Sequence, residues 1–259
     1  MIDIHTHLLP GCDDGSPNLE TSISHLRDIS TSSVREVILT PHYFPGIYNQ
    51  DLQALQNIFL DLKKELITND INLGLHLGAE VYLEHLDCED MPLQKLVIQG
   101  TDYILFETNM GKLPPKLKSI LYKMLRMGFK PIMAHPERYA YIFNNPENAE
   151  DFIHLSIYLQ INAGSLLGLY GKKIAKAAWI LLNKGYAHFI ASDDHASKDN
   201  YSLALAEHPV RSRIDNYTWE LLTDANPRLM LANQKIDFFY VKNITERKSL
   251  ISSIIEKLF

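Results

Sequence analysis

Histidines and carboxylates recur in this 259-residue chain at the ends of short apolar runs. His5 and His7 form an H-x-H pair directly after the run at residues 1–4, and side chains two residues apart on a strand point to the same side. Asp193 and His195 repeat this spacing later in the chain. One such residue alone is more often solvated or structural, but imidazoles and carboxylates together suit divalent metals. The candidate ligands are His5, His7, Asp14, His42, Glu80, Glu107, His135, Asp193 and His195.

The same sequence argues against several other chemistries. Cys12 and Cys88 do not form a pair at metal-binding spacing, so a structural zinc site is not expected. A cysteine-based tyrosine phosphatase needs an arginine six positions after the cysteine, where this chain has Asn18 and Gln94. The GSLLG segment at residues 164–168 lacks the residue order of a serine nucleophile elbow. Binding of divalent metals is what the residue types favour.

Strand-like and helix-like segments alternate along the chain and would position these side chains. Short apolar runs predict seven strands, at residues 1–4, 34–40, 73–80, 102–106, 131–134, 156–161 and 188–191. Amphipathic or glycine-terminated segments predict helices at residues 19–29, 52–66, 114–127, 174–183 and 249–258. Strands that are apolar along their whole length are typical of parallel sheets covered on both faces.

The alternation predicts an α/β fold with a parallel sheet. A closed seven-stranded barrel and an open doubly wound sheet both fit the pattern. Polar, metal-competent residues follow nearly every strand, which favours the barrel, because barrel enzymes build their sites at the carboxyl ends of the strands. No linker or repeat divides the chain, so residues 1–259 are expected to form a single domain.

Composition narrows the classes of partner and compartment. The chain has 25 Lys and Arg against 31 Asp and Glu, a formal charge of −6, which argues against nucleic-acid binding. The first residues show no basic segment followed by an apolar run, so we expect no secretory signal, and no apolar run reaches the roughly 20 residues that a membrane span needs. Two cysteines fit free thiols in a reducing compartment, so we expect a cytoplasmic protein without membrane insertion. The oligomeric state is not legible in the sequence.

Six motifs, taken in order, resemble those of the polymerase and histidinol phosphatase (PHP) superfamily. They are MIDIHTHLLPGCDDGS, TPHY, GAE, FE, AHPERY and ASDDH, and they lie within residues 1–195. The opening motif together with AHPERY is most similar to the PHP-type tyrosine-protein phosphatases of bacterial capsule and exopolysaccharide clusters. The resemblance implies the PHP fold, a distorted TIM-like (β/α)7 barrel, which holds about three divalent metal ions, usually manganese.

The resemblance also implies residue roles. One metal would bind His5, His7, Glu80 and Asp193. A second would share Glu80 and add Glu107 and His135, and a third would bind Asp14, His42 and His195. Arg138 of AHPERY would be the catalytic, phosphate-binding arginine.

The implied reaction is hydrolysis of phosphotyrosine by a metal-activated hydroxide. Its implied protein substrate is a bacterial tyrosine kinase of capsule or exopolysaccharide synthesis. Two alternatives stay open. One is a phosphatase of histidinol phosphate or another small phosphomonoester, and the other is a weakly active regulatory partner of the kinase.

The chain departs from the family pattern at two points. Asn200 occupies a position where the family commonly has a second arginine. The nearby basic residues that could replace it are Lys198, Arg211 and Arg213. ASDDH also contains Asp194 beside Asp193, and the two-residue spacing to His195 favours Asp193 as the ligand.

Other histidines and the aromatic residues have simpler interpretations. The histidines outside the motifs, which we expect to be structural, are His25, His76, His154, His188 and His208. Tyr43, Tyr48 and Tyr139 lie nearest to the motifs and are candidates for a wall against a phosphotyrosine ring. Core packing is the favoured role for most of the 13 tyrosines.

Overall fold

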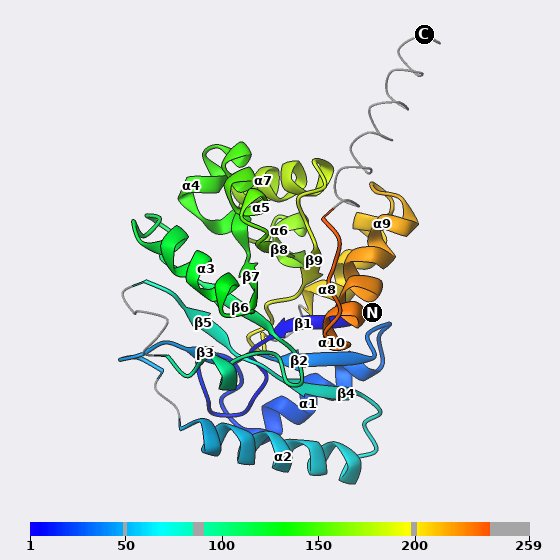
Figure 1. The fold of residues 1–259 in the computed structure, drawn as a ribbon. Coiled ribbons are helices and arrows are strands. Elements are labelled where there is room, and N and C mark those ends of the chain that lie inside the picture. Colours follow the sequence, from blue (N-terminus) through cyan, green and yellow to red (C-terminus); the bar gives the residue numbers. More distant parts are fainter. Residues whose placement is uncertain (49–50, 85–90, 198–200, 239–259) are drawn as a thin grey trace.

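A computed structural model describes residues 1–48, 51–84, 91–197 and 201–238 (Figure 1). Cys88, Lys198, Asn200 and the helix expected at residues 249–258 lie outside the described residues. Among the described helices, none is long and apolar enough to cross a bilayer.

Two parallel sheets form the centre of the described structure. The first has the order β1 (Ile2–Thr6), β2 (Glu36–Leu39) and β4 (Gly74–Leu77). The second has the order β3 (His42–Tyr43), β5 (Glu80–Tyr82), β6 (Tyr103–Glu107), β7 (Lys130–Ala134), β8 (Tyr158–Asn162) and β9 (Phe189–Ala191). Every pairing in both sheets is parallel, as the sequence predicts.

Two of the predicted strands are each divided into two segments. The run at residues 34–40 contributes β2 and leads through Pro41 into β3, while the run at 73–80 is β4 and the start of β5, separated at Gly78. The two breaks lie side by side, because the Gly78 N–H donates to the Leu39 carbonyl (2.8 Å) and the Glu80 N–H to the Pro41 carbonyl (3.1 Å). The first sheet therefore continues into the second.

The other edges of the sheets meet where β9 returns to β1. The Asp193 N–H donates to the His5 carbonyl (2.9 Å) and the His7 N–H to the Asp194 carbonyl (2.8 Å), and Thr6 forms a parallel bridge with Asp194. With continuity on one side and these bonds on the other, the strands enclose a common interior. The fold is the parallel α/β arrangement expected for a distorted barrel of seven strand–helix units.

Helices cover the outside of the strands (Figure 1). They are α1 (Leu19–Ser30), α2 (Leu52–Thr68), α3 (Leu117–Arg126), α4 (Ala140–Phe143), α5 (Glu150–His154), α6 (Ala163–Leu167), α7 (Lys172–Asn183), α8 (Ser202–Arg211), α9 (Asn216–Glu220) and α10 (Asn226–Leu231). Shorter turns are η1 (Leu93–Lys95), η2 (Pro136–Arg138), η3 (Pro146–Ala149) and the π segment η4 (Leu221–Ala225).

Local chemistry sets the ends of the predicted helices. Asn18 caps α1 and Asp51 caps α2, each accepting a hydrogen bond from a backbone N–H in the first turn. The expected helix at 114–127 is shorter, because Pro114 belongs to a turn that precedes Leu117. Helix α7 starts before the predicted residue 174, directly after Gly171, whose φ of +92° ends the preceding loop.

Apolar side chains fill the interior and the layer between strands and helices. The strand faces alternate, so that Ile104 and Phe106 of β6 join the helix-facing cluster while Tyr103 and Leu105 join the interior cluster. Glu107 continues the inward series of β6 and lies at its carboxyl end. Because apolar side chains pack the rest of the interior, the polar ligand candidates are confined to this end.

The loop after β1 is fixed against the strand by close backbone packing. The Ser16 N–H donates to the His7 carbonyl and the Gly11 N–H to the Ser16 carbonyl, both at 2.8 Å. A Cβ atom at Gly15 would lie 2.0 Å from the His7 carbonyl oxygen. Only glycine fits this position without moving the loop or the end of β1.

Replacing Gly15 by alanine should therefore destabilise the protein. We expect Gly15→Ala to lower the free energy of unfolding by about 3 kcal/mol, the upper end for overpacking. Gly111→Ala is the matched control, since its Cβ would make only an ordinary 3.4 Å contact with Asn109. Urea denaturation gives the free energy of unfolding of both variants. Equal values for Gly15→Ala and Gly111→Ala would contradict the close packing at Gly15.

His188 supplies a pH-dependent contribution to stability. It is fully buried, its Nδ1 accepts a hydrogen bond from the Leu159 N–H (3.1 Å), and the rings of Tyr158 and Phe238 pack against it. Burial lowers the pKa of His188 from 6.5 to about 3. Between pH 6.5 and about pH 3, His188 therefore binds a proton in the unfolded chain but not in the folded chain. The free energy of unfolding falls as the pH decreases below 6.5.

We expect this loss to reach up to about 1.4 kcal/mol per pH unit. His188→Gln removes the titrating group, so the stability of the wild type relative to this variant should decrease between about pH 7 and about pH 5. Urea denaturation at both values gives the comparison. A stability difference that does not change with pH would show that His188 is not held neutral by the fold.

Candidate active site

All nine ligand candidates and Arg138 gather at the carboxyl ends of the strands. His5 and His7 come from the end of β1, and Asp14 from the loop that follows it. His42, Glu80 and Glu107 belong to β3, β5 and β6. His135 and Arg138 follow β7, and Asp193 and His195 follow β9. Eight of the ten line or border a cavity of about 270 Å³, which contains Asp14, His42, Glu80, Glu107, His135, Arg138, Asp193 and His195.

The innermost four candidates form a compact buried cluster. The Nε2 atoms of His5 and His7 are 3.1 Å apart. Glu80 Oε2 lies 3.2 Å from the first and 3.3 Å from the second, and Asp193 Oδ1 lies 3.3 and 3.4 Å from them. These four residues are the set that the resemblance assigns to one metal.

The outer partners of the two imidazoles fix which nitrogens face the centre. His5 Nδ1 is 2.9 Å from Gln160 Oε1, and His7 Nδ1 is 2.7 Å from Asp13 Oδ2. Both partners are acceptors, so each Nδ1 carries the proton and donates it. In the neutral rings, the two Nε2 lone pairs then converge with two carboxylate oxygens. Such an arrangement is repulsive without a positive charge at its centre, and this donor set fits a divalent cation.

The pKa shifts within the cluster also indicate that it favours a positive charge at its centre. Burial opposes charge on His5, but Glu80 and Asp193 outweigh it and raise its pKa to about 9. Burial likewise opposes ionisation of Glu80, but the neighbouring imidazoles, His5 first, hold its pKa well below the usual value. Without a metal, the site would therefore attract protons. In both cases a buried partner of opposite charge outweighs the cost of burial.

A second group lies toward the cavity. Asp14 Oδ1 is 3.5 Å from His42 Nε2 and 3.6 Å from His195 Nε2, and His7 completes the group. The other ring nitrogen of His42, Nδ1, is 3.2 Å from both Glu80 Oε2 and Glu107 Oε1. His42 Nδ1 and Glu80 Oε2 are buried without a hydrogen-bond partner, which leaves both atoms free to bind a cation.

The groupings differ in part from those that the resemblance implies. His42 joins Glu80 and Glu107 in the structure, where His135 was expected. His135 instead lies against the other oxygen of Glu80, with Nε2 3.0 Å from Oε1. The left-handed backbone of His135 (φ of 40°) turns it into the site at the start of η2. The nine candidates thus form one continuous cluster, in which His42 and Glu80 each belong to two of the groups.

Three polar residues that the sequence analysis missed hold the ligands in place. Asp13 orients His7 and also accepts a hydrogen bond from the backbone N–H of His42 (2.9 Å). Gln160 orients His5 and donates to Asn162 (2.8 Å), which in turn donates to Asp193 Oδ2 (2.7 Å). Gln160 and Asn162 have the same two-residue spacing at the end of β8 as the H-x-H pair, a signal that was available in the sequence.

Asp193, rather than Asp194, belongs to the cluster. Asp193 directs Oδ1 to the histidines, while Asp194 lies 3.8 Å from His25 Nδ1 on the side of α1. Burial, with Asp3 nearby, raises the pKa of Asp194 to about 7. The spacing argument from the sequence thus agrees with the geometry.

Arg138 is the one basic side chain, among the described residues, that lines the cavity. Its Nη1 donates to Asp193 Oδ2 (2.8 Å), and its guanidinium packs 4.8 Å from the Tyr170 ring centre. Two of the suggested replacements for a second arginine are engaged elsewhere. Arg211 is one of them and pairs with Glu207 (3.0 Å).

Arg213 packs over the Trp179 ring at 5.0 Å from its centre, outside the cavity lining. The third suggested residue, Lys198, lies outside the described residues, as does Asn200. Within the part of the chain that the structure describes, no second arginine lines the cavity beside Arg138.

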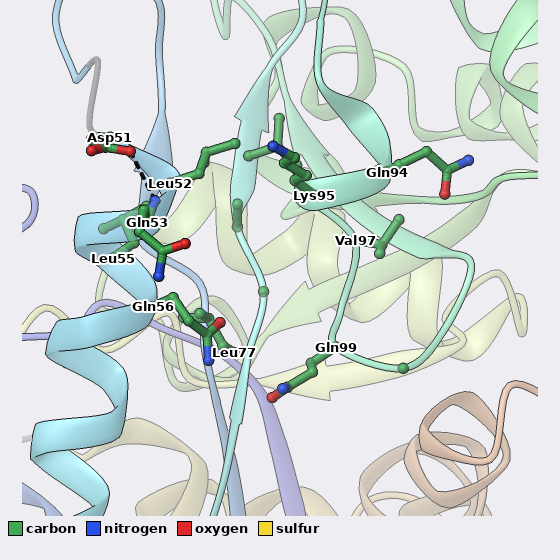
Figure 2. A pocket seen from close by; sticks show the side chains of 14 residues that line it. Asp51, Leu52, Gln53, Leu55, Gln56, Leu77, Gln94, Lys95, Val97 and Gln99 are labelled. Carbon is green, nitrogen blue, oxygen red and sulfur yellow. Dashed lines mark hydrogen bonds between the residues drawn. The ribbon is translucent and has the colours of Figure 1, made fainter.

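A larger cavity of about 530 Å³ lies between the start of α2, the β4–β5 break and η1. Figure 2 shows that amide and aliphatic side chains surround it, among them Gln53, Gln56 and Gln99. None of the candidate metal-binding groups found among the described residues lies there. The chemistry is therefore assigned to the smaller, polar cavity.

Comparisons with known proteins agree with the motifs. A family model described as capsular polysaccharide synthesis, CpsB/CapC, matches residues 1–232. Tyrosine-protein phosphatase YwqE of Bacillus subtilis is 32% identical over 91% of this chain and 93% of its own length. Putative tyrosine-protein phosphatase CapC of Staphylococcus aureus is 30% identical over the same shares.

Solved structures give the same result. Crystal structures of YwqE from Bacillus subtilis and CpsB from Streptococcus pneumoniae are described as metal-dependent tyrosine phosphatases, and one of their chains matches with a TM-score of 0.83 at 30% identity, covering 92% of this chain and 96% of that one. A phosphotriesterase homology protein from Escherichia coli shares the fold at 15% identity, with a TM-score of 0.57. Since the family model and these relatives span most of the sequence, the chain belongs to the CpsB/CapC family of capsular polysaccharide synthesis.

Proposed function

We propose that this chain is a metal-dependent protein-tyrosine phosphatase. The observation that carries the proposal is the convergence of imidazole nitrogens and carboxylate oxygens on one buried centre beside Arg138. The names of its relatives support the same activity. The proposed ligands of about three divalent ions, with manganese as the proposed metal, are His5, His7, Asp14, His42, Glu80, Glu107, His135, Asp193 and His195.

The residues of the chain prepare the reaction in distinct ways. Bound divalent ions would lower the pKa of a coordinated water and balance the charge of the phosphoryl oxygens. Asp13 and Gln160 hold the two imidazoles of β1 with Nε2 toward the centre. Because the phenolic hydroxyl of tyrosine has a pKa near 10, its anion can leave without a strong general acid.

Arg138 is the proposed phosphate-binding residue. Burial disfavours its charge, but Asp193 outweighs this and raises the pKa of the guanidinium, so it stays charged. One donor is bound to Asp193, and the planar fork offers further N–H groups at the cavity for phosphoryl oxygens. Lysine lacks this fork and would bind the same oxygens less well.

The substrate that we propose is a tyrosine-phosphorylated protein of capsule or exopolysaccharide synthesis, specifically the bacterial tyrosine kinase of that system. Support comes from the family description, capsular polysaccharide synthesis, and from the tyrosine phosphatase names of the relatives. The kinase itself is an inference from these names.

The direct test is release of phosphate from a phosphotyrosine peptide. We expect manganese-loaded protein to hydrolyse it, chelation to abolish the activity, and added Mn²⁺ to restore it, because the ligand cluster cannot activate water alone. Histidinol phosphate serves as the competing substrate. Absence of activity on the peptide in protein with its metal content verified by elemental analysis would refute the proposal.

Arg138→Ala should lower kcat/KM for the peptide by about 100-fold or more, the usual cost of losing a group that stabilises transition-state charge. Arg138→Lys should recover only part of this loss. Arg213→Ala is the control, because Arg213 packs on Trp179 away from the cavity lining. Steady-state kinetics at saturating Mn²⁺ distinguish the variants, and an Arg138→Ala protein as active as the control would exclude the proposed role.

A further inference from the structure

The polar cavity has one apolar wall that the proposed chemistry does not use. Besides the candidate ligands and Arg138, its lining consists of Phe44, Tyr48 and Met110. All three side chains are half-buried, so they present surface to the cavity. Arg138 borders this 270 Å³ space and also a second cavity of about 530 Å³ beside Tyr170, but His42, Glu80 and Glu107 lie in the first, together with the apolar wall.

Backbone hydrogen bonds fix the two aromatic residues. Phe44 and Tyr48 form an antiparallel bridge, in which the Tyr48 N–H donates to the Phe44 carbonyl (2.8 Å) and the Phe44 N–H to the Tyr48 carbonyl (3.2 Å). Gly46 enables the tight turn between them with its φ of +93°. The turn directly follows β3, so it is attached to the strand that holds His42.

Each ring of the turn also stacks on another ring. Phe44 stacks on Tyr82 of β5, with ring centres 3.9 Å apart and planes at 8°. Tyr48 stacks on His42, with ring centres 5.6 Å apart and planes at 13°. Both rings are therefore held in orientation before any ligand arrives, which reduces the entropy lost on binding.

Met110 borders the cavity from a second element. It follows β6, and its carbonyl accepts a hydrogen bond from the Ala140 N–H (2.7 Å), next to the η2 turn that contains Arg138. A thioether is polarisable and makes favourable contacts with aromatic rings. The wall thus combines two rings and one sulfur around the space beside the phosphate site.

We propose that Phe44, Tyr48 and Met110 form an aryl subsite that selects aryl phosphates, such as phosphotyrosine, over phosphates of alkyl hydroxyls. The inference rests on the proposed phosphatase function and adds the source of its selectivity. A planar ring gains offset or edge contacts with the two aromatic side chains and with the sulfur. A short alkyl substituent, such as that of phosphoserine, does not reach these contacts.

Binding of two phosphonates to manganese-loaded protein tests the subsite. Phenylphosphonate and methylphosphonate share the anionic group and differ in the ring. We expect the wild type to prefer phenylphosphonate by about tenfold or more, and Phe44→Ala and Met110→Ala each to reduce this preference several-fold through lost ring contacts. Isothermal titration calorimetry gives both dissociation constants.

Methylphosphonate is the internal control for the metal centre. Its affinity should stay unchanged in both variants, whereas damage to the ligands would weaken both phosphonates equally. Tyr122→Ala, which removes an exposed ring on α3, is the matched variant and should leave the preference intact. At the third wall position we use Tyr48→Leu instead of alanine. Leucine removes the ring but keeps an apolar side chain beside His42, which Tyr48 contacts.

The two proposals fail in different ways. If metal-loaded protein hydrolyses the phosphotyrosine peptide but every wall variant keeps the wild-type phosphonate preference, the aryl subsite is wrong and the phosphatase function stands. If no hydrolysis occurs while the preference depends on the wall, the reaction is wrong and the subsite stands. Equal weakening of both phosphonates in Phe44→Ala and Met110→Ala would also overturn the subsite, because the wall would then support only the metal centre.

Discussion

The site depends on the repulsion between groups that the fold forces together. Two imidazole nitrogens 3.1 Å apart face two carboxylate oxygens inside a pocket without solvent. Charges in such surroundings are costly unless a counter-charge is present. The hydrogen bonds of His5 Nδ1 and His7 Nδ1 prevent the rings from turning away. A bound cation would therefore balance the lone pairs and carboxylate charges that face one another.

The barrel supplies the rigidity that this arrangement requires. Strand ends from both sheets contribute ligands, and the bonds between β9 and β1 bring Asp193 beside His5. Behind them lies a second layer of polar contacts, in which Asn162 and Arg138 share one oxygen of Asp193. That shared oxygen leaves the other oxygen of Asp193 for the cluster. The proposed phosphate-binding residue and a proposed metal ligand are thereby oriented by the same contact.

The sequence predicts much of this, because strand periodicity and motif order survive folding. The parallel α/β fold, the positions of the strands and the gathering of the ligand candidates follow from the end-of-strand pattern. The sequence does not predict the division of two strands at Pro41 and Gly78, because this division arises from hydrogen bonds between neighbouring strands of the sheet. The pairing of His42 with Glu107 also depends on three-dimensional geometry. The aromatic turn is predicted only in part. The sequence indicates Tyr48 as a candidate for an aromatic wall, whereas Phe44 is recognised only from its stacking on Tyr82 of another strand.

The closure of β9 on β1 has a consequence for biosynthesis. The Asp193 N–H bonds the His5 carbonyl, so the first and last strands of the barrel meet only after nearly two hundred residues have been made. Contacts of such sequence separation form late and slow folding. A nascent chain without β9 has His5, His7 and Glu80 but lacks the fourth member of the inner cluster. Assembly of the inner group of proposed metal ligands thus coincides with completion of the barrel, and an unfinished chain lacks the complete group.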